Sequence, residues 1–300
     1  MEYISVKDWA NRHGVSERTA RNYCAQGKIS EAFLVGKTWN IPIDATLPKR
    51  KKTESVSPLL KVLREQKDSQ VKGGIYHRVQ IDLTYNSNHI EGSRLTHDQT
   101  RYIFETNTIG VTDKAVNVDD IIETANHFRA IDYIIKETDG KLTETYIKQL
   151  HLILKSGTSD ERKDWFRVGN YKKLPNEVGG NDTTTPENVH KAMKALLKEY
   201  NNKQYPTFED ILDFHQRFET IHPFQDGNGR VGRLIMFREC LRNNYVPFII
   251  TDDLKIFYYN GLRHWPHIKG YLTDTCLTAQ ATLNFLLDNF LTKYKNNLNF

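Results

Sequence analysis

The twelve residues at 222–233, His-Pro-Phe-Gln-Asp-Gly-Asn-Gly-Arg-Val-Gly-Arg, contain groups suited to chemistry on a nucleoside triphosphate. His222 is a candidate general base, because an imidazole titrates near neutral pH. Asp226 offers the hard oxygen ligand that Mg²⁺ takes when it also binds substrate phosphates. Arg230 and Arg233 lie three residues apart, so on a helix they can bind different oxygens of one polyphosphate.

The residues after this stretch predict how it is held. An apolar run without a helix breaker follows at 234–241, so the loop should lead directly into a helix. The unpaired N–H groups and the positive dipole at a helix N-terminus favour an anion, here a phosphate. Gly227 and Gly229 let the backbone approach that anion or adopt a positive φ. The alternative interpretation is a glycine-rich turn with a capping carboxylate and solvated arginines.

The stretch resembles the signature of the Fic family, also called Fido, H-x-F-x-[D/E]-G-N-G-R-x-x-R, and matches every constrained position. The resemblance implies that AMP passes from ATP to a Ser, Thr or Tyr hydroxyl of a target protein. It implies that His222 deprotonates this hydroxyl, that Phe224 anchors the loop and that Asp226 holds the magnesium ion. The phosphates are assigned to the other positions: Gly227, Asn228 and Gly229 to the α- and β-phosphates, Arg230 to the β-phosphate and Arg233 to the γ-phosphate.

A second segment, at 84–93, resembles the inhibitory motif of the same family, [S/T]-x-x-x-E-[G/N]. Ser87, Glu91 and Gly92 occupy its constrained positions. The resemblance implies an inhibitory helix near 84–92 whose glutamate pairs with Arg233 and denies it to the γ-phosphate. At about 1.5 to 3 kcal/mol per charged hydrogen bond, this pair would lower productive binding roughly ten- to hundredfold. An ordinary helix that ends in Glu-Gly is the alternative.

The glutamate of this motif is implicated in removing AMP from targets in some relatives, so both directions of the reaction stay open. The family presents its target along a β-hairpin flap, which should fall at 166–171 and 177–182, where the pattern is poorly matched. Pairing along a strand edge positions a chain without reading its sequence, so the target stays open as well. Tyr258 and Tyr259 lie where relatives place aromatic rings against adenosine, with packing of a helix face as the alternative.

The N-terminal residues predict a helix, a glycine turn and a second helix over 5–24. Ser5 and Ser16 are credible N-caps, and Gly14 suits the left-handed position that ends the first helix. A short hairpin is expected over 33–42, with its turn at Gly36 and Lys37.

This unit, about residues 1–46, resembles the winged helix-turn-helix of the excisionase and MerR-like families. The resemblance implies DNA binding through Arg18, Arg21 and Asn22, whose side chains can reach phosphates or base edges. A helical interaction module without a DNA target is the alternative.

The charge of the chain is concentrated at this end. The net charge is +5, and residues 1–58 contribute +4 of it, from ten Lys and Arg against six Asp and Glu. Four consecutive basic residues at 49–52 lie in a Pro- and Ser-containing stretch, 47–58, that we interpret as a linker.

Composition points to a soluble cytoplasmic protein. No apolar run approaches the roughly 20 residues of a membrane span, and the first residues lack the apolar core of a signal peptide. Cys24, Cys240 and Cys276 are few, odd in number and widely spaced, which argues against a disulfide framework or a zinc site.

Downstream of the linker the chain is predicted to be mainly α-helical, with a Fic helical core over 59–300 and a small β-hairpin flap. The segments with helix-compatible apolar spacing are 59–68, 119–137, 144–155, 187–201, 208–220, 231–243 and 278–294.

The sequence therefore predicts a protein AMP-transferase that uses ATP and Mg²⁺, is restrained by Glu91 and is fused to a DNA-binding module. A homo-oligomer is a further expectation, as the state that would release Glu91. Two alternatives are kept. One is a Doc-like kinase with an inverted triphosphate, although that branch departs from the signature at the positions of Gly229 and Arg233. The other is a transcription regulator that only senses nucleotide, although such a sensor has no need of His222.

Overall fold

The computed structural model describes residues 2–25, 28–36, 38–48, 57–110 and 115–297. The chain divides into two compact units, Met1–Glu54 and Ser55–Phe300, each with its own core. Most of the predicted linker, including the basic residues 49–52, lies outside the described residues.

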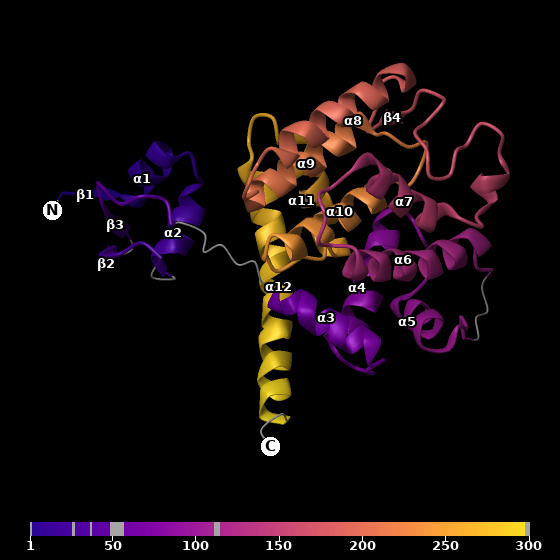
Figure 1. The fold of residues 1–300 in the computed structure, drawn as a ribbon, viewed down its shortest axis with the longest axis horizontal. Helices are drawn as coiled ribbons and strands as arrows, with labels where there is room; N and C mark the ends of the chain where they lie inside the picture. Colours follow the sequence, from indigo (N-terminus) through magenta and orange to yellow (C-terminus); the bar gives the residue numbers. More distant parts are fainter. Residues whose placement is uncertain (1, 26–27, 37, 49–56, 111–114, 298–300) are drawn as a thin grey trace. The chain divides into compact units, whose positions relative to one another are not determined.

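The first unit combines two helices with a small antiparallel sheet (Figure 1). Its elements are β1 (Tyr3–Ser5), α1 (Val6–His13), α2 (Glu17–Ala25), β2 (Phe33–Val35) and β3 (Thr38–Pro42). The sheet order is β1-β3-β2, so β3 pairs with both other strands. The Ser5 side chain caps α1 by accepting from the Asp8 backbone N–H, and Gly14 ends α1 at φ 65°.

The two helices of the first unit pack onto its sheet through one large aromatic side chain. Trp9 and Ile41 are fully buried, and the Trp9 indole N–H donates to the Ala45 carbonyl at 2.8 Å. The predicted helices and hairpin are therefore present in this unit, with Lys37 of the hairpin turn outside the described residues.

The second unit is almost entirely helical, and its elements are α3 (Pro58–Asp68), α4 (Ile75–Ile90), α5 (His97–Thr106), α6 (Val118–Lys136), α7 (Glu144–Lys155), η1 (Ser159–Arg162), β4 (Glu177–Val178), β5 (Asn181–Asp182), α8 (Pro186–Asn201), α9 (Phe208–Ile221), α10 (Asn228–Arg242), η2 (Asp252–Leu254), α11 (Lys255–His264) and α12 (Gly270–Asn297). Among the described residues, no helix combines the length and the apolar character that crossing a membrane requires.

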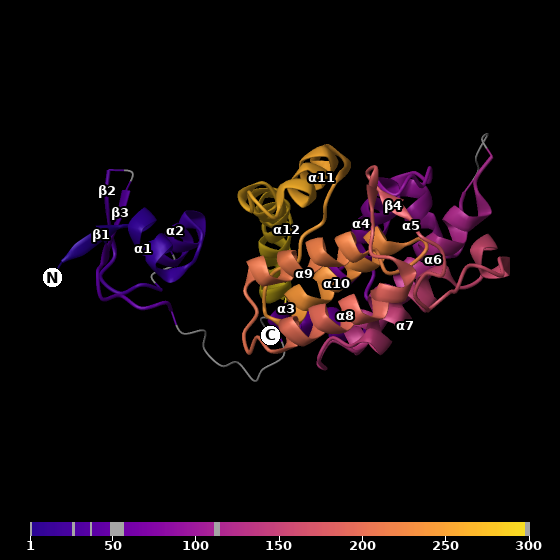
Figure 2. The ribbon, with the colours of Figure 1, turned by 90° about the horizontal axis from the view of Figure 1, so that it is seen from above.

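Helix α10 is the centre of this unit. It contacts α4, α6, α7 and α9, and Figures 1 and 2 show it surrounded by these helices. Nearly all of its residues are buried, which is the pattern of a helix enclosed on every side. The functional stretch therefore leads into the most enclosed helix of the fold, where side chains have little freedom to move.

Several boundaries differ from the sequence prediction, although each predicted helix is present. Helix α10 begins at Asn228, three residues before the predicted start, because Gly227 at φ 78° already serves as its N-cap. Helix α12 begins at Gly270 instead of at residue 278. The sequence prediction missed its first turns because they contain polar and β-branched residues. Helices α5 and α11 were not predicted, and α4 extends the expected inhibitory helix towards its N-terminus.

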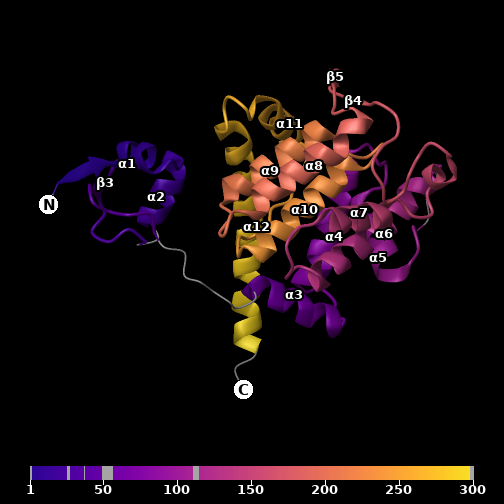
Figure 3. The ribbon, with the colours of Figure 1, turned by 45° about the horizontal axis from the view of Figure 1, so that its top comes forward.

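The flap is smaller than predicted. Only β4 and β5 pair, through Glu177 with Asp182 and Val178 with Asn181, and they project beside α8 (Figure 3). No strand forms at 166–171, because Phe166 is buried and Gly169 turns the backbone at φ 75°.

Helices α11 and α12 pack at a distance that only glycine allows. A Cβ on Gly261 would lie 2.7 Å from the Leu272 Cα. We predict that Gly261→Ala lowers the free energy of unfolding by about 1 to 3 kcal/mol, because two backbones must separate. Gly270→Ala is the control, since its Cβ would meet no atom within 4 Å. Equal urea midpoints for the two variants would contradict this packing.

Candidate active site

The stretch 222–233 comprises a closed loop between α9 and α10, residues 222–227, and the first turns of α10. A capping box of Thr207 and Asp210 fixes the start of α9, and His222 ends that helix in the left-handed conformation at φ 51°. Phe224 is fully buried, and its ring stacks on the His151 ring at 4.0 Å between centroids. The predicted anchoring role of Phe224 therefore agrees with its position in the core.

Asn228 holds this loop closed through its side chain. Its Oδ1 accepts from the Phe224 backbone N–H and its Nδ2 donates to the Phe224 carbonyl, both at 2.8 Å. The side chain is buried and both of its functional groups are used. Asn228 was predicted to cradle phosphate. In the structure its side chain shapes the loop, which leaves the backbone of 227–229 to meet an anion.

His222 is held in the neutral form that a general base needs. Its Nδ1 lies 3.3 Å from the Glu219 carbonyl oxygen, which can only accept, so the proton belongs on Nδ1 and Nε2 is the basic nitrogen. Burial lowers the pKa of His222 to about 4, and the nearby charge of Lys172 acts in the same direction.

Arg233 is enclosed by the end of α4 and the residue that follows it. Its Nη2 donates to Glu91 Oε1 at 2.7 Å and to the Ser87 carbonyl at 2.8 Å, and its Nε donates to Ser87 Oγ at 3.0 Å. Ser87 belongs to α4, Glu91 is the C-cap of that helix, and Gly92 follows at φ 97°. The structure thus brings together Ser87, Glu91 and Arg233, as the two motifs predicted.

Glu91 also lies directly over the first turn of α10. A Cβ on Gly229 would come within 2.2 Å of Glu91 Oε1 and 3.0 Å of Arg233 Nη1. Any larger residue at position 229 would therefore displace this carboxylate. The Glu91 carboxylate occupies the helix N-terminus that we expected to bind phosphate.

A buried polar layer lies behind Arg233. Glu219 is held against Gly232, and burial raises its pKa to about 8, with the charge of Glu91 acting in the same direction and Arg233 opposing it. His215 Nε2 lies 2.5 Å from the Tyr258 hydroxyl, and burial lowers the pKa of His215 to about 3. Glu219 and His215 were not predicted to belong to the site, since they show no motif of their own.

The two tyrosines that were predicted to contact adenosine differ in their surroundings, and only Tyr258 belongs to this buried layer. Tyr258 is 1% exposed and packs in the core, which fits the alternative of helix packing rather than a ring face open to nucleotide. Tyr259 is 41% exposed, and its assignment to adenosine stays a prediction.

Asp226 is part of a cluster of charges that sequence reasoning missed. Its Oδ2 accepts from Lys155 Nζ at 2.7 Å and from Arg230 Nη2 at 3.1 Å. These two cations outweigh the effect of burial and hold the pKa of Asp226 well below its usual range. Glu123 binds both Lys155 and Arg230, and Asp160 also binds Lys155. Arg230, predicted to reach a phosphate, is therefore directed at carboxylates.

The donor set fits a magnesium ion at Asp226. The Asp226 side chain is 51% exposed, whereas those of Glu123 and Asp160 are 11% and 15% exposed. A metal that arrives with substrate phosphates would therefore meet Asp226, and a single carboxylate suits Mg²⁺, which keeps most of its other ligands from phosphate and water.

The segment before the flap is tied to the loop from the other side. The Lys172 backbone N–H donates to the Pro223 carbonyl at 2.9 Å, and Asn176 Nδ2 donates to the Phe224 carbonyl at 3.0 Å. Lys172 Nζ in turn holds Asn176 Oδ1 and Thr183 Oγ1, each at 2.6 Å. The flap and the loop that bears the base are therefore one connected structure.

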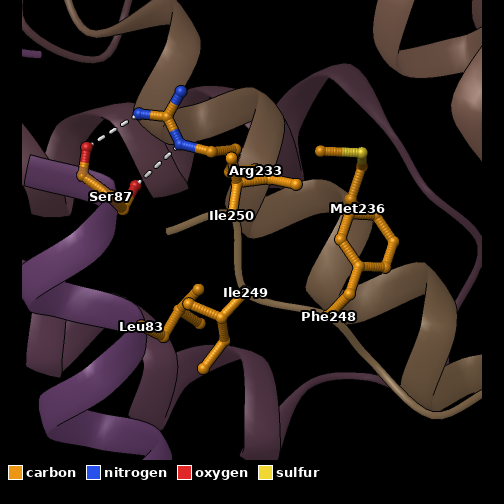
Figure 4. Close-up of a pocket in the computed structure, with 7 residues that line it drawn as sticks. All are labelled: Leu83, Ser87, Arg233, Met236, Phe248, Ile249 and Ile250. Carbon is orange, nitrogen blue, oxygen red and sulfur yellow. Dashed lines mark hydrogen bonds between the residues drawn. The ribbon is translucent and has the colours of Figure 1, made fainter. Parts of the chain in front are cut away.

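A small pocket opens beside Arg233 on the side of α4 (Figure 4). Arg233 and Ser87 form its polar edge, and the rest of its lining is apolar, from Leu83, Met236, Phe248, Ile249 and Ile250. A cavity of about 10 Å³ has room for a single water molecule at most, so we assign it no substrate.

The residues predicted to contact DNA lie on one face of α2. Arg18, Arg21 and Asn22 are exposed, whereas Ala20 and Cys24 on the opposite face are buried. Arg21 also pairs with Glu17 at 2.5 Å on the surface.

Comparison with known proteins agrees with this site. Residues 141–240, which include α7, the flap and the loop with most of α10, match the Fic/DOC family model. The matches support a Fic domain in this chain. Similar curated proteins are named protein adenylyltransferase Fic. The one from Drosophila grimshawi is 29% identical over 188 residues, and the one from Drosophila melanogaster is 27% identical over 187 residues.

Each alignment covers 60% of this chain and 36% of the relative, so the chain spans about a third of these proteins. Among solved structures, a Fic domain containing signaling protein from Bacteroides thetaiotaomicron is 26% identical, with a TM-score of 0.58. The match covers 74% of this chain and 91% of that one. Fic-1 from C. elegans has a TM-score of 0.60 at 19% identity, and the match covers 78% of this chain and 72% of that one. The two proteins share the fold.

Three buried histidines of the site, together with His127 of α6, which lies 2.9 Å from the Thr84 hydroxyl, predict a loss of stability in acid. Burial lowers the pKa of His127, His151 and His215 to about 3 and that of His222 to about 4, from the ordinary imidazole pKa of 6.5. The unfolded chain therefore binds more protons as the pH falls below about 6.5, and the free energy of unfolding decreases. Glu219 acts in the opposite sense, but one carboxyl does not offset four imidazoles.

Urea unfolding at about pH 7 and about pH 5 measures this effect. His127→Gln should reduce the pH slope of the unfolding free energy by about one proton, or about 1.4 kcal/mol per pH unit. The matched control is His267→Gln, at an exposed position. A slope that is unchanged in His127→Gln would show that His127 does not stay neutral in the folded protein.

Proposed function

We propose that the chain is a protein adenylyltransferase that moves AMP from ATP to a hydroxyl of a target protein. The observation that carries the proposal is the convergence on one helix N-terminus of a neutral imidazole, an exposed carboxylate and a buried arginine. These are His222, Asp226 and Arg233. The names of the similar curated proteins support the same activity.

In this mechanism His222 Nε2 accepts the proton of the target hydroxyl as its oxygen bonds to the α-phosphorus of ATP. The bond from that phosphorus to the bridging oxygen breaks, and pyrophosphate leaves. The backbone of 227–229 and the positive end of α10 stabilise negative charge on the phosphates, and Arg233 binds the γ-phosphate. A magnesium ion held by Asp226 supplies further positive charge when it is bound. Catalysis then depends on positioning and charge neutralisation, as nucleotidyl transfer requires.

Glu91 restrains this activity in the same proposal. Its carboxylate takes Arg233 Nη2 and covers Gly229, so the γ-phosphate and Glu91 compete for one arginine and one helix terminus. The contact is partly buried, which strengthens it relative to a surface ion pair.

Removal of Glu91 tests this restraint. Glu91→Gly should raise self-modification by labelled ATP about ten- to hundredfold, because Arg233 loses its carboxylate partner. Glu137→Gly is a matched control, since Glu137 also follows the last residue of a helix, α6, and lies outside the site. Equal incorporation in Glu91→Gly and in the unmodified chain would remove the inhibitory role.

The base is tested in the Glu91→Gly background. Adding His222→Ala should lower incorporation by at least about a hundredfold, because proton transfer by a positioned side chain contributes about 10² to 10⁴. Undiminished incorporation would contradict the mechanism. Mass spectrometry of the product distinguishes AMP from a single phosphate, and so separates the adenylyltransferase from a Doc-like kinase. Incubation of the AMP-modified target with the unmodified chain tests AMP removal.

We also propose that the first unit binds DNA. The supporting observation is the exposed face of α2 that presents Arg18, Arg21 and Asn22 on a helix-turn-helix framework. Such side chains reach phosphates and base edges when the second helix enters the major groove.

Fluorescence anisotropy with random double-stranded DNA tests this role. The full chain should bind with an affinity that falls steeply with salt, and the double variant Arg18→Ala/Arg21→Ala should bind at least about tenfold more weakly. Lys198→Ala, at an exposed position of the second unit, is the control. Absent or salt-insensitive binding by the unmodified chain would leave the helical interaction module as the better account.

A further inference from the structure

Lys155, the last residue of α7, lies at the centre of the charge cluster behind Asp226. Its Nζ is 2.5 Å from Glu123 Oε1, 2.6 Å from Asp160 Oδ2 and 2.7 Å from Asp226 Oδ2, and its side chain is 3% exposed. An ammonium group has three N–H donors, so three carboxylates satisfy it. Lys155 therefore has no donor left for a phosphate.

The three carboxylates are close enough to bind one cation together. An oxygen from each of Glu123, Asp160 and Asp226 lies within 4.8 Å of the other two, and the ammonium of Lys155 contacts all three. Lys155, Arg230 and the surface residue Lys163, which binds Asp160, supply three positive charges against three negative ones. The cluster is thus neutral, and its cation position is filled by the chain itself.

We infer that Lys155 is a resident cation that keeps free divalent metal out of this cluster, so that metal binds at Asp226 only together with nucleotide. The inference rests on the proposed function, in which Asp226 is the magnesium ligand. A free divalent ion would meet a cluster without net negative charge and a lysine ammonium at close range. The phosphates of ATP supply the negative charge and the oxygen ligands that the cluster then lacks.

Removal of the lysine charge should convert the cluster into a metal site. Lys155→Met leaves three carboxylates with Arg230 and the exposed Lys163 as neighbouring cations, so the net charge becomes more negative by one. Even with the screening of bulk water, a charge this close changes the affinity for a divalent ion about tenfold or more. Hard cations such as Mn²⁺ bind carboxylate oxygens of this kind.

The experiment measures Mn²⁺ binding to the full chain by electron paramagnetic resonance, with and without ATP. All proteins carry Glu91→Gly, so that nucleotide can enter the site. Lys155→Met is compared with Lys155→Arg, which keeps the charge, and with Lys163→Met. Lys163 is the matched control, because it binds Asp160 at 2.6 Å but lies at the surface, with a side chain that is 43% exposed.

We expect Lys155→Met to bind one Mn²⁺ per chain without ATP, at least about tenfold more tightly than the parent, Lys155→Arg and Lys163→Met. These three should bind Mn²⁺ tightly only when ATP is present. Nucleotide-free binding that is equally tight in the parent would overturn the inference, and so would its absence in Lys155→Met.

Loss of a buried cation destabilises the variant, and thermal unfolding provides the second measurement. Mn²⁺ should raise the melting temperature of Lys155→Met and leave that of the parent unchanged, because only the variant binds the ion in its folded form. A Lys155→Met protein that Mn²⁺ does not stabilise or restore would overturn the inference. If the parent fails to bind Mn²⁺ even with ATP, the proposed function itself is wrong, whatever the variants do.

Discussion

The contact between Arg233 and Glu91 is the interaction on which the rest of the site depends. A buried guanidinium requires an anionic or polar partner, and α4 delivers Glu91 and two oxygens of Ser87 to it. The same carboxylate covers Gly229 at the start of α10. A triphosphate would satisfy the arginine and the helix terminus equally well, and in the proposed mechanism a small displacement at the end of α4 exchanges one anion for the other.

The enclosed helix α10 explains why such an exchange can be specific. The two arginines in its first turns are three residues apart and each is held by its own carboxylates, Arg230 by Glu123 and Asp226 and Arg233 by Glu91. Because the helix is buried on nearly every side, neither guanidinium can move far when its partner leaves. On this account Arg230 and Lys155 keep the Asp226 carboxylate charged and in place for the metal ion that arrives with nucleotide. Only Arg233 exchanges its partner.

The sequence predicted the parts of the site that lie within short contiguous motifs. The loop, the base and the pairing of Glu91 with Arg233 were all predicted from two short motifs. Lys155 could not be predicted, since its carboxylate partners come from α6, η1 and the loop, and only the fold brings them together. The burial of Tyr258, a predicted nucleotide contact, could not be predicted for a similar reason, because it depends on how α11 packs against α12 and not on its position after the motif.

The most direct test of the account is calorimetric binding of ATP and of AMP to the unmodified chain and to Glu91→Gly. If Glu91 and the γ-phosphate compete for Arg233, the substitution should raise the affinity for ATP about tenfold or more and leave the affinity for AMP nearly unchanged. An equal gain for both nucleotides, or no gain for ATP, would show that Glu91 does not hold the place of the terminal phosphate.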